Sequence, residues 1–485
     1  MDSNIQLAQR ILSHFPYAPN DQQLQLTAAL ARYCTPAAGN TPSADRVFLL
    51  NGYAGTGKTS IIGALVKALA DVRVPTVLLA PTGRAAKVLA GACSHPAYTI
   101  HRRIYRGDAA AVAGYAPIVN DNRLTGAVFI VDEASMIGSE SAEGVNLLHD
   151  LIHYVFSGTD CRLILIGDSA QLPPVGCELS PAMDPEVLRS MGLKTTRATI
   201  TATARQRGGS GILYNATRLR VALQRRDSEE EKDEDSLPVI YASPFDDVRV
   251  IGGGDELAEA ILADYNDAPD DDGMAETIII TRSNRRATEF NRGVRSIILG
   301  HEEELCRGDR LMVVKNNYLW GAKIKRFDFI ANGDVAIVER IISTEERYTL
   351  RWADVELYFP DRDTSLECKI MVDTLSSLSA SLDADKAARF EQAILNDPDL
   401  FTPSITLEQR RRALKNDLYY NALRVKYAYC VTCHKAQGGQ WRNVYVDIGY
   451  LPPETSVNEL LRWLYTATTR ATTRLNFIAP PLEVK

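Results

Sequence analysis

Two groups of residues in the first third of the chain could carry out chemistry on a nucleoside triphosphate. The first is the string from Gly52 to Thr59, GYAGTGKT, which fits the pattern G-x-x-x-x-G-K-[ST]. Gly55 and Gly57 allow backbone N–H groups to converge on an anion. Lys58 adds a charge for the β- and γ-phosphates, and the Thr59 hydroxyl can ligate Mg²⁺. The alternative is an ordinary glycine turn, but the apolar run before the string and the helical pattern after it favour a triphosphate site.

The second group is a pair of carboxylates, Asp132 and Glu133, which follows the apolar run Val128–Val131. Beside a triphosphate, Asp132 would hold Mg²⁺ through its waters, and Glu133 would polarise the water that attacks the γ-phosphate. Gln171 follows another apolar run, Leu163–Ile166, and lies where it could sense the γ-phosphate. These three side chains complete the catalytic set that the first half of the chain can supply.

Arginines and a glutamine extend this predicted site. Arg205 and Arg470 could reach the γ-phosphate from a second domain, because a guanidinium fork suits phosphate oxygens and keeps its charge; each by itself would be interpreted as a surface arginine. Asn20 is a plausible N-cap of a helix whose first turn holds Gln22 and Gln23, and an amide there could read an adenine edge, with Gln23 favoured. The predicted ATP-binding residues are Gln23, Gly52, Tyr53, Ala54, Gly55, Thr56, Gly57, Lys58, Thr59 and Ser60.

The elements that must position these residues are short apolar strands alternating with helical patterns, which indicates a doubly wound parallel sheet. The strand Thr76–Ala80 ends in Pro81, Thr82 and Arg84, in a loop where open α/β sheets bind ligands. Thr82 and Arg84 could therefore touch a phosphate backbone, although a helix cap at Thr82 is an equally good interpretation.

A second α/β pattern follows, with predicted strands at Ala198–Thr203, Thr277–Ile280, Tyr427–Cys433 and Val444–Asp447. Between its halves, alternating runs from Leu311 to Asp373 predict a small β-barrel, and a capping box at Thr406–Gln409 opens a helix. The string C-x-x-C-H at Cys430–His434 matches a haem-attachment motif and half of a zinc site. Haem attachment needs an exported chain and zinc needs a second ligand pair, which is not found, so both cysteines are expected to pack in a buried strand.

Composition sets broad limits. The 485 residues, 45% of them hydrophobic, are enough for three or four domains. The net charge of −7 argues weakly against nucleic acid, but many of the acids lie in two runs, Asp227–Ser236 and Asp264–Asp272, which are expected to be solvated loops. The chain has no apolar run long enough to cross a bilayer and begins without a signal sequence, so we expect no membrane association and a cytoplasmic location with reduced cysteines.

Taken together, the motifs resemble those of superfamily 1B DNA helicases of the RecD and Dda kind, which move from 5′ to 3′. The resemblance covers nearly the whole chain, and its motifs stand in the expected order: GYAGTGKT, APTGRAAK, TIH, VDEAS, GDSAQLPPVG, ARQ, GDRLMVVKNNY, NGD, TCHKAQG and YTATTRA.

The resemblance implies two RecA-like domains, at residues 1–196 and at 197–310 with 425–485. It also implies a pin domain at 105–126 and an SH3-like barrel with a helical extension at 311–424. ATP and Mg²⁺ are the implied cofactors, with Arg205 and Arg470 as arginine fingers. The implied partners are single-stranded and forked duplex DNA, in repair, replication or recombination. The DNA-binding residues predicted from the loop and the resemblance are Pro81, Thr82, Arg84, Thr99, His101, Asn332, His434 and Lys435.

Several alternatives remain open at this stage. Within the motor class, the chain could move on single strands or displace proteins without separating a duplex, or it could act on RNA. In another class, it could be a P-loop nucleotide switch or kinase, which would leave the second α/β half unexplained. We expect a monomer, with single-strand-binding or replication proteins as candidate partners.

Overall fold

The structure is a computed structural model, and it describes residues 3–35, 46–105, 118–139, 146–202, 209–227, 237–267, 273–317, 319–321, 330–379, 382–401, 406, 409, 413–414, 416–452 and 454–485. Three features predicted from the sequence lie wholly or mostly outside these residues: the pin at 105–126, Arg205 and the acidic run at 227–236. In the described part, no helix combines the length and apolar character needed to cross a bilayer.

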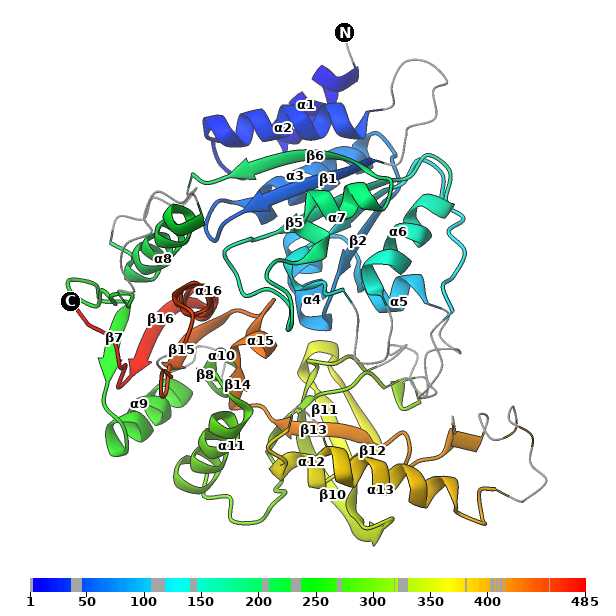
Figure 1. The fold of residues 1–485 in the computed structure, drawn as a ribbon, viewed down its shortest axis with the longest axis vertical. Coiled ribbons are helices and arrows are strands. Elements are labelled where there is room, and N and C mark those ends of the chain that lie inside the picture. The colour runs from blue at the N-terminus through cyan, green and yellow to red at the C-terminus, as the bar shows by residue number, and fades with distance from the viewer. Residues whose placement is uncertain are drawn as a thin grey trace.

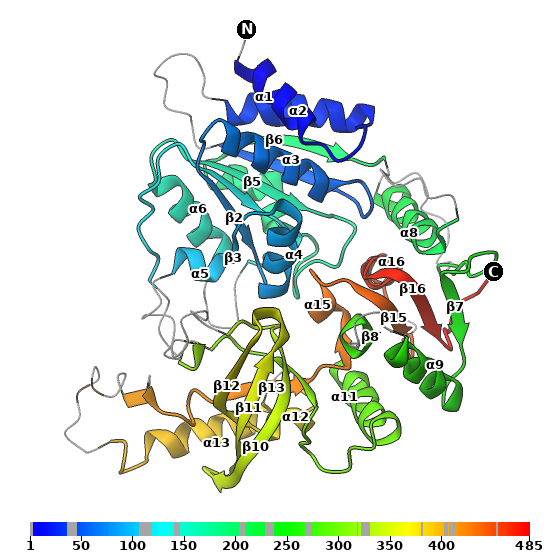
Figure 2. The same ribbon diagram turned by 180° about the vertical axis from the view of Figure 1, so that it is seen from behind.

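The first domain is a parallel sheet covered by helices on both faces (Figures 1 and 2). Its strand order is β3-β2-β4-β5-β1-β6, and all the pairings are parallel. Its elements are α1 (Ser3–Ser13), α2 (Asp21–Cys34), β1 (Arg46–Gly52), α3 (Lys58–Asp71), β2 (Thr76–Ala80), α4 (Gly83–Cys93), β3 (Ala97–Thr99), α5 (Ile100–Ile104), β4 (Val128–Val131), η1 (Ala134–Met136), α6 (Leu147–Ser157), β5 (Arg162–Gly167), η2 (Pro181–Met183), α7 (Pro185–Ser190) and β6 (Lys194–Ile200).

The central strands of this sheet are continuous apolar runs because both of their faces are covered. Every residue of β4 is buried, as are the last five residues of β5. Helix α2 begins with the predicted cap: the Asn20 side chain accepts from the Gln23 N–H, and Gln23 Oε1 accepts from the Asn20 N–H at 3.0 Å.

The second domain is also a parallel sheet, with strand order β14-β8-β15-β16-β7. Two parallel sheets of this kind fit the expected pair of RecA-like domains. The elements are α8 (Gly211–Asp227), β7 (Val248–Ile251), α9 (Asp255–Asn266), α10 (Gly273–Glu276), β8 (Thr277–Thr281), α11 (Asn284–Gly293), η3 (Val294–Ile298), β14 (Cys430–Thr432), α15 (Cys433–Ala436), β15 (Trp441–Asp447), α16 (Val457–Thr468) and β16 (Ala471–Ile478).

Two strand predictions are wrong. The first three residues of the segment predicted as Ala198–Thr203 belong to β6, which ends at Ile200 and pairs with β1 in the first sheet, so the predicted domain boundary after residue 196 falls inside a strand. The segment Tyr427–Cys433 is two strands in different domains, because β13 (Leu423–Tyr427) closes the barrel and β14 joins the second sheet. A strand's own side chains do not specify which neighbour it pairs with.

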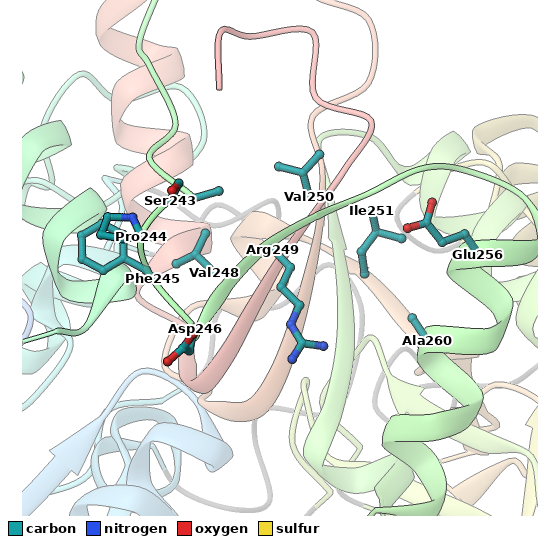
Figure 3. A pocket seen from close by; sticks show the side chains of 11 residues that line it. Ser243, Pro244, Phe245, Asp246, Val248, Arg249, Val250, Ile251, Glu256 and Ala260 are labelled. Atoms are coloured by element: carbon teal, nitrogen blue, oxygen red, sulfur yellow. The ribbon is translucent and has the colours of Figure 1, made fainter. Parts of the chain in front are cut away.

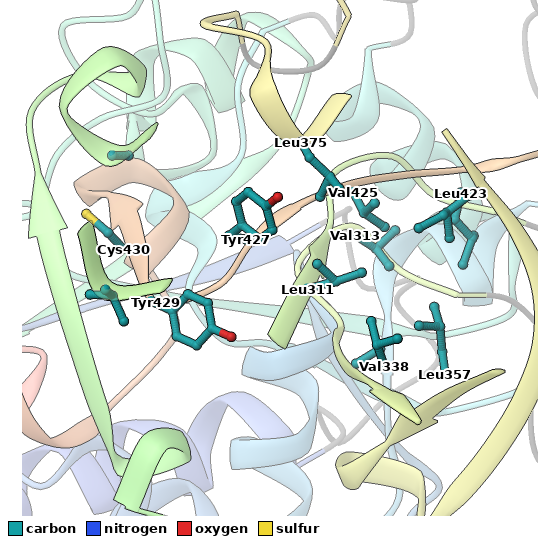
Figure 4. Close-up of a cluster of buried hydrophobic side chains, with 14 of the residues drawn as sticks. Leu311, Val313, Val338, Leu357, Leu375, Leu423, Val425, Tyr427, Tyr429 and Cys430 are labelled. Atoms are coloured by element: carbon teal, nitrogen blue, oxygen red, sulfur yellow. The ribbon is translucent and has the colours of Figure 1, made fainter. Parts of the chain in front are cut away.

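The predicted β-barrel is confirmed as a closed barrel of strands β10-β11-β12-β13-β9. Side chains from its strands fill the interior, and Tyr429 and Cys430 continue the same apolar cluster into the second domain (Figure 4). The remaining elements are β9 (Arg310–Val313), β10 (Val335–Arg347), β11 (Leu350–Phe359), η5 (Pro360–Arg362), β12 (Thr364–Met371), α12 (Asp373–Ser376) and α13 (Ala384–Leu395).

Two smaller predictions are also confirmed. The Thr406 hydroxyl accepts from the Gln409 N–H, and Gln409 Oε1 accepts from the Thr406 N–H, which is the predicted capping box. Cys430 and Cys433 are free, buried thiols, and burial raises the pKa of both. Both are packing residues, as expected, but only Cys430 lies in a strand, because Cys433 begins α15.

Candidate active site

The predicted nucleotide-binding residues gather at one edge of the first sheet. Strands β1, β2, β4 and β5 are parallel, so their carboxyl ends lie at the same edge (Figure 1). Gly52, Asp132 and Asp168 stand at or just after three of these ends. The topology therefore brings together motifs that are more than 100 residues apart in sequence.

The loop between β1 and α3 has the backbone that its glycines predict. Gly55 and Gly57 have positive φ angles, +76° and +82°. At Gly52 the constraint is a close approach, because a Cβ would lie 2.7 Å from the Lys58 side chain. The loop then leads directly into the N-terminus of α3, where a helix favours an anion.

Lys58 is folded back onto its own loop. Its Nζ donates to the carbonyl oxygens of Gly52 and Tyr53, the latter at 3.1 Å. Thr59, in contrast, is exposed, so its hydroxyl is accessible to a metal ion. A phosphate group at this loop would replace the two carbonyl oxygens as the acceptor of the Lys58 ammonium.

Asp132 and Glu133 lie side by side at the end of β4. Burial raises the pKa of the Asp132 carboxyl, while the Glu133 N–H and the Lys58 charge oppose that rise. Burial also raises the pKa of Glu133, and the Asp132 carboxylate adds to the rise. Arg470 lies near enough for its charge to oppose the rise at Glu133. A carboxylate with a raised pKa is a better proton acceptor near neutral pH, which suits a general base.

The backbone at Glu133 is unusual for a residue with a Cβ. Its φ angle is +53°, in the left-handed region. Such a conformation costs of the order of 1–3 kcal/mol and persists only where the surroundings hold it.

The buried Gln171 side chain has an unused hydrogen-bond acceptor in the part of the chain that the structure describes. It is only 5% exposed, yet its Oε1 has no hydrogen-bond partner among the described residues. Its N–H donates to the carbonyl of Asp168 at 3.1 Å, so the turn itself is fixed. An unsatisfied buried acceptor is costly, and a bound water or ligand donor at this position would remove the cost.

The two candidate glutamines have different partners. Gln23 is 1% exposed, and its Nε2 donates to the carbonyl of Thr56 in the phosphate loop at 3.0 Å. Gln22 instead accepts from the N–H groups of Thr201 and Ala202, both at 2.9 Å, at the end of β6. Gln23 is thus tied to the nucleotide loop and Gln22 to the strand exit, and the adenine role of Gln23 stays a prediction.

Arg470 lies in the second domain, and it is 4% exposed. Its guanidinium donates to the carbonyls of Thr466 and Gly439 and to the Thr469 hydroxyl, at 3.1–3.2 Å. These three acceptors all belong to the second domain, which therefore fixes the orientation of the Arg470 guanidinium.

Sequence reasoning missed how closely the second domain contacts the phosphate loop. The Tyr465 hydroxyl, on α16, accepts from the Ala54 N–H at 2.8 Å. On α8, Gln224 donates to the Tyr53 hydroxyl at 2.9 Å, and the Arg220 guanidinium lies 4.7 Å from the centre of the Tyr53 ring. Tyr465 stands in the motif YTATTRA, but neither α8 residue carries a sequence signal.

The predicted DNA-binding threonines are helix caps here. Thr82 Oγ1 accepts from the Ala85 N–H, and Thr99 Oγ1 accepts from the Arg102 N–H, both at 3.2 Å. Arg84 contacts the second domain instead of solvent: its guanidinium lies 3.8 Å from the centre of the Trp441 ring and donates to the Gln440 carbonyl. Burial lowers the pKa of Arg84 to about 10.

Three of the predicted DNA-binding segments meet at the N-terminus of α4. A Cβ on Gly83 would lie 2.8 Å from Asp334 Oδ1 in the barrel, next to Asn332. A Cβ on Gly438 would lie 3.4 Å from Thr82 Oγ1. The loop after β2 thus contacts both the second domain and the barrel. The centre of the His101 ring lies 5.7 Å from that of Tyr105.

Two lysines, Lys426 on the barrel strand β13 and Lys435 on α15 of the second domain, form a pair that the sequence reasoning did not identify. Lys426 and Lys435 line one small pocket together with Asn284 and Thr288. Burial lowers the pKa of Lys426 to about 8, and the Lys435 charge adds to the effect. Burial also lowers the pKa of Lys435. Two partly desolvated ammonium groups facing one pocket favour an anion there.

His434 precedes Lys435 and points to the first domain. Its ring is hydrogen-bonded to the backbone of Pro173, and desolvation lowers its pKa. Its neighbour Gln437 donates to the Leu172 carbonyl at 2.7 Å. The segment TCHKAQG is therefore in contact with the loop that carries Gln171.

Two family models match the chain. The model described as an AAA domain matches residues 37–230, and the UvrD-like helicase C-terminal domain matches residues 427–478. The resemblance to superfamily 1B helicases is confirmed. The two matched helicase segments contain the phosphate loop and the motif YTATTRA, which face each other in the structure.

Several known proteins and solved structures are similar to the chain. The ATP-dependent RecD2 DNA helicase of Deinococcus radiodurans is 34% identical over 138 residues, which is 28% of this chain and 17% of that protein. The uncharacterized protein R530 of Acanthamoeba polyphaga mimivirus is 21% identical over 89% of this chain and 95% of its own length. Among solved structures, the Pif1 helicase from Bacteroides, in complex with ADP-AlF3 and ssDNA, is 14% identical, with a TM-score of 0.47 over 95% of this chain and 92% of that one.

A separate pocket of about 660 Å³ lies beside β7, the edge strand of the second sheet (Figure 3). Its lining is mixed, with Phe245 and Val250 next to Arg249 and Glu256. The described residues around it include none of the predicted nucleotide or DNA residues, so it is not part of this site.

Proposed function

We propose that the chain is an ATP-driven DNA helicase that moves along single-stranded DNA from 5′ to 3′ and unwinds duplex DNA. The observation that carries the proposal is the contact between the phosphate loop of the first domain and α16 of the second. A site built by two domains couples hydrolysis to their relative motion, whereas a P-loop switch or kinase has no need of the second sheet.

The residues present fit ATP and Mg²⁺. The exposed Thr59 hydroxyl and the Asp132 carboxylate would hold the metal ion, and the loop N–H groups with Lys58 would hold the phosphates. Glu133 would accept a proton from the attacking water, and the unpartnered Gln171 Oε1 is an acceptor suited to orient that water. Arg470 and Arg205 would stabilise charge on the γ-phosphate from the second domain.

DNA is proposed to cross the edge where the loop after β2, the barrel turn at Asn332 and the segment TCHKAQG meet. The predicted residues Pro81, Thr82, Arg84, Thr99, His101, Asn332, His434 and Lys435 would line its path. Lys426 is added because it shares a pocket with Lys435. Base pairing costs about 1.4 kcal/mol per step, which is small beside one ATP, so unwinding is thermodynamically allowed.

The test is unwinding of 5′-tailed and 3′-tailed duplexes with ATP. Faster unwinding of the 5′-tailed substrate supports the proposal, and preference for the 3′-tailed substrate overturns the polarity. ATP hydrolysis stimulated by single strands without unwinding indicates a translocase, and matched RNA forks test RNA as the substrate. Absence of any stimulation by nucleic acid favours the switch or kinase alternative.

A further inference from the structure

The Tyr465 hydroxyl joins three parts of the site across the two domains. It accepts from the Ala54 N–H of the phosphate loop at 2.8 Å, and it donates to Asp168 Oδ2 at 2.7 Å. The direction of both bonds is fixed, because an N–H can only donate and a carboxylate only accepts. Ala54 and Tyr465 are 411 residues apart in sequence.

Asp168 connects this hydroxyl to the predicted sensor. The Asp168 side chain is 1% exposed and also accepts from the Ala170 N–H at 3.0 Å. The Asp168 carbonyl accepts from the Gln171 N–H, which closes the turn that presents the Gln171 side chain. The residue whose carboxylate accepts from Tyr465 therefore also closes the Gln171 turn through its backbone carbonyl.

Other contacts hold the same turn against the second domain. The Thr466 hydroxyl accepts from the Leu172 N–H at 2.8 Å, and Arg462 donates to the Ser169 carbonyl. Both side chains come from α16, which lies on the side of the second sheet that faces the first domain (Figures 1 and 2). Tyr465 differs from these two because its hydroxyl also bonds to the phosphate loop.

We propose that Tyr465 is a positioning residue that couples the approach of the second domain to the geometry of the phosphate loop and of Gln171. When the domains are together, its hydroxyl fixes Ala54 and Asp168 at once; when they separate, both bonds are lost and the turn at Gln171 is released. ATP hydrolysis is then fast only in the closed arrangement. This inference rests on the proposed ATPase function.

The test is Tyr465→Phe, which removes the hydroxyl and keeps the ring. We expect kcat for ATP hydrolysis with single-stranded DNA to fall about tenfold, the size of one hydrogen bond to a charged group. The KM for ATP should change less than twofold, because Lys58 and the loop N–H groups remain. The ratio of DNA-stimulated to basal hydrolysis should fall with kcat.

Tyr445→Phe is the matched control. Tyr445 is also buried and donates to a buried carboxylate, Asp264 Oδ2, at 2.7 Å, but this bond lies within the second domain. The Tyr445→Phe variant also loses one buried hydroxyl and should lose a similar amount of stability. Because the lost bond lies within one domain, DNA stimulation of ATP hydrolysis should stay near the wild-type value. Thermal unfolding of both variants verifies that they are folded.

A double-mutant cycle of Tyr465→Phe with Asp168→Asn tests whether Tyr465 acts through Asp168. If Tyr465 acts through Asp168, the double variant should lose no more than the worse single variant. Equal DNA stimulation in Tyr465→Phe and Tyr445→Phe overturns the inference, as does a fully additive double variant. A wild-type chain without DNA-stimulated hydrolysis overturns the proposed function instead, which separates the two failures.

Discussion

The pH dependence of DNA binding should report the charge of Lys426. The free protein holds this ammonium partly buried beside Lys435, which lowers its pKa to about 8, with a weaker opposing effect from Asp383. A bound phosphate would restore the pKa toward its ordinary value of about 10.4. Because binding raises the pKa, affinity is full below about pH 8 and falls as the pH rises above it.

The expected change in DNA affinity follows from the protonated fraction of Lys426. That fraction falls from roughly nine-tenths at pH 7 to one-tenth at pH 9, so the affinity for single-stranded DNA should fall about tenfold over this range. Tyr427 and Cys430 also line the pocket, but burial raises the pKa of both, and they stay neutral over this range. Lys435 remains in every variant, so its contribution cancels in a comparison.

Fluorescence anisotropy of a labelled oligonucleotide at constant ionic strength gives the affinities. Lys426→Arg keeps the charge at all pH values and should lose most of the pH dependence that wild type shows. Lys426→Met should bind weakly at both pH values, while Lys194→Met, at an exposed position on β6, serves as a control for general charge. A wild-type protein and a Lys426→Arg variant with equal slopes between pH 7 and 9 would refute the reasoning.

Three further predictions concern the nucleotide site and the fold. Lys58→Ala should abolish ATP hydrolysis, because it removes the ammonium that would bind the β- and γ-phosphates; DNA-stimulated turnover in this variant would contradict the motor function. Glu133→Gln should keep ATP binding and lose turnover by 100-fold or more, of the order expected for general base catalysis, measured by nucleotide binding and steady-state hydrolysis; failure to bind ATP argues against a base. Arg295→Ala should destabilise the fold by about 3–5 kcal/mol in chemical unfolding, because Asp309 is fully buried and would lose its bidentate partner at 2.8 and 2.9 Å. A loss under about 1 kcal/mol would mean that His301 or water replaces the guanidinium.

The local chemistry of this protein could be predicted from its sequence. The phosphate loop is encoded in a short stretch in which strand, glycines and helix follow one another, so no distant residue is needed to recognise it. The same holds for Asp132 and Glu133 after β4, for the cap at Asn20, and for the alternating barrel strands. In each case the signal and the structure lie within about ten residues.

Tertiary structure decided which of these pieces touch. The half-polar pattern of β6 fits either sheet, and only its pairing with β1 assigned it to the first. Arg84 lies in a motif that predicts contact with a phosphate backbone, yet its guanidinium packs on the Trp441 ring of the other domain. Lys426 and Lys435 share a pocket only because β13 and α15 are folded against α11.

The phosphate loop itself illustrates the same division. Its residues determined that an anion can bind, because backbone angles and a lysine act locally. The contact of Ala54 with Tyr465 was beyond sequence reasoning, because hydrogen bonds between distant segments depend on how whole domains pack and leave no periodic pattern in either segment. The sequence by itself determined the chemistry of each half of the site, and the packing of the two domains decided how the halves face each other.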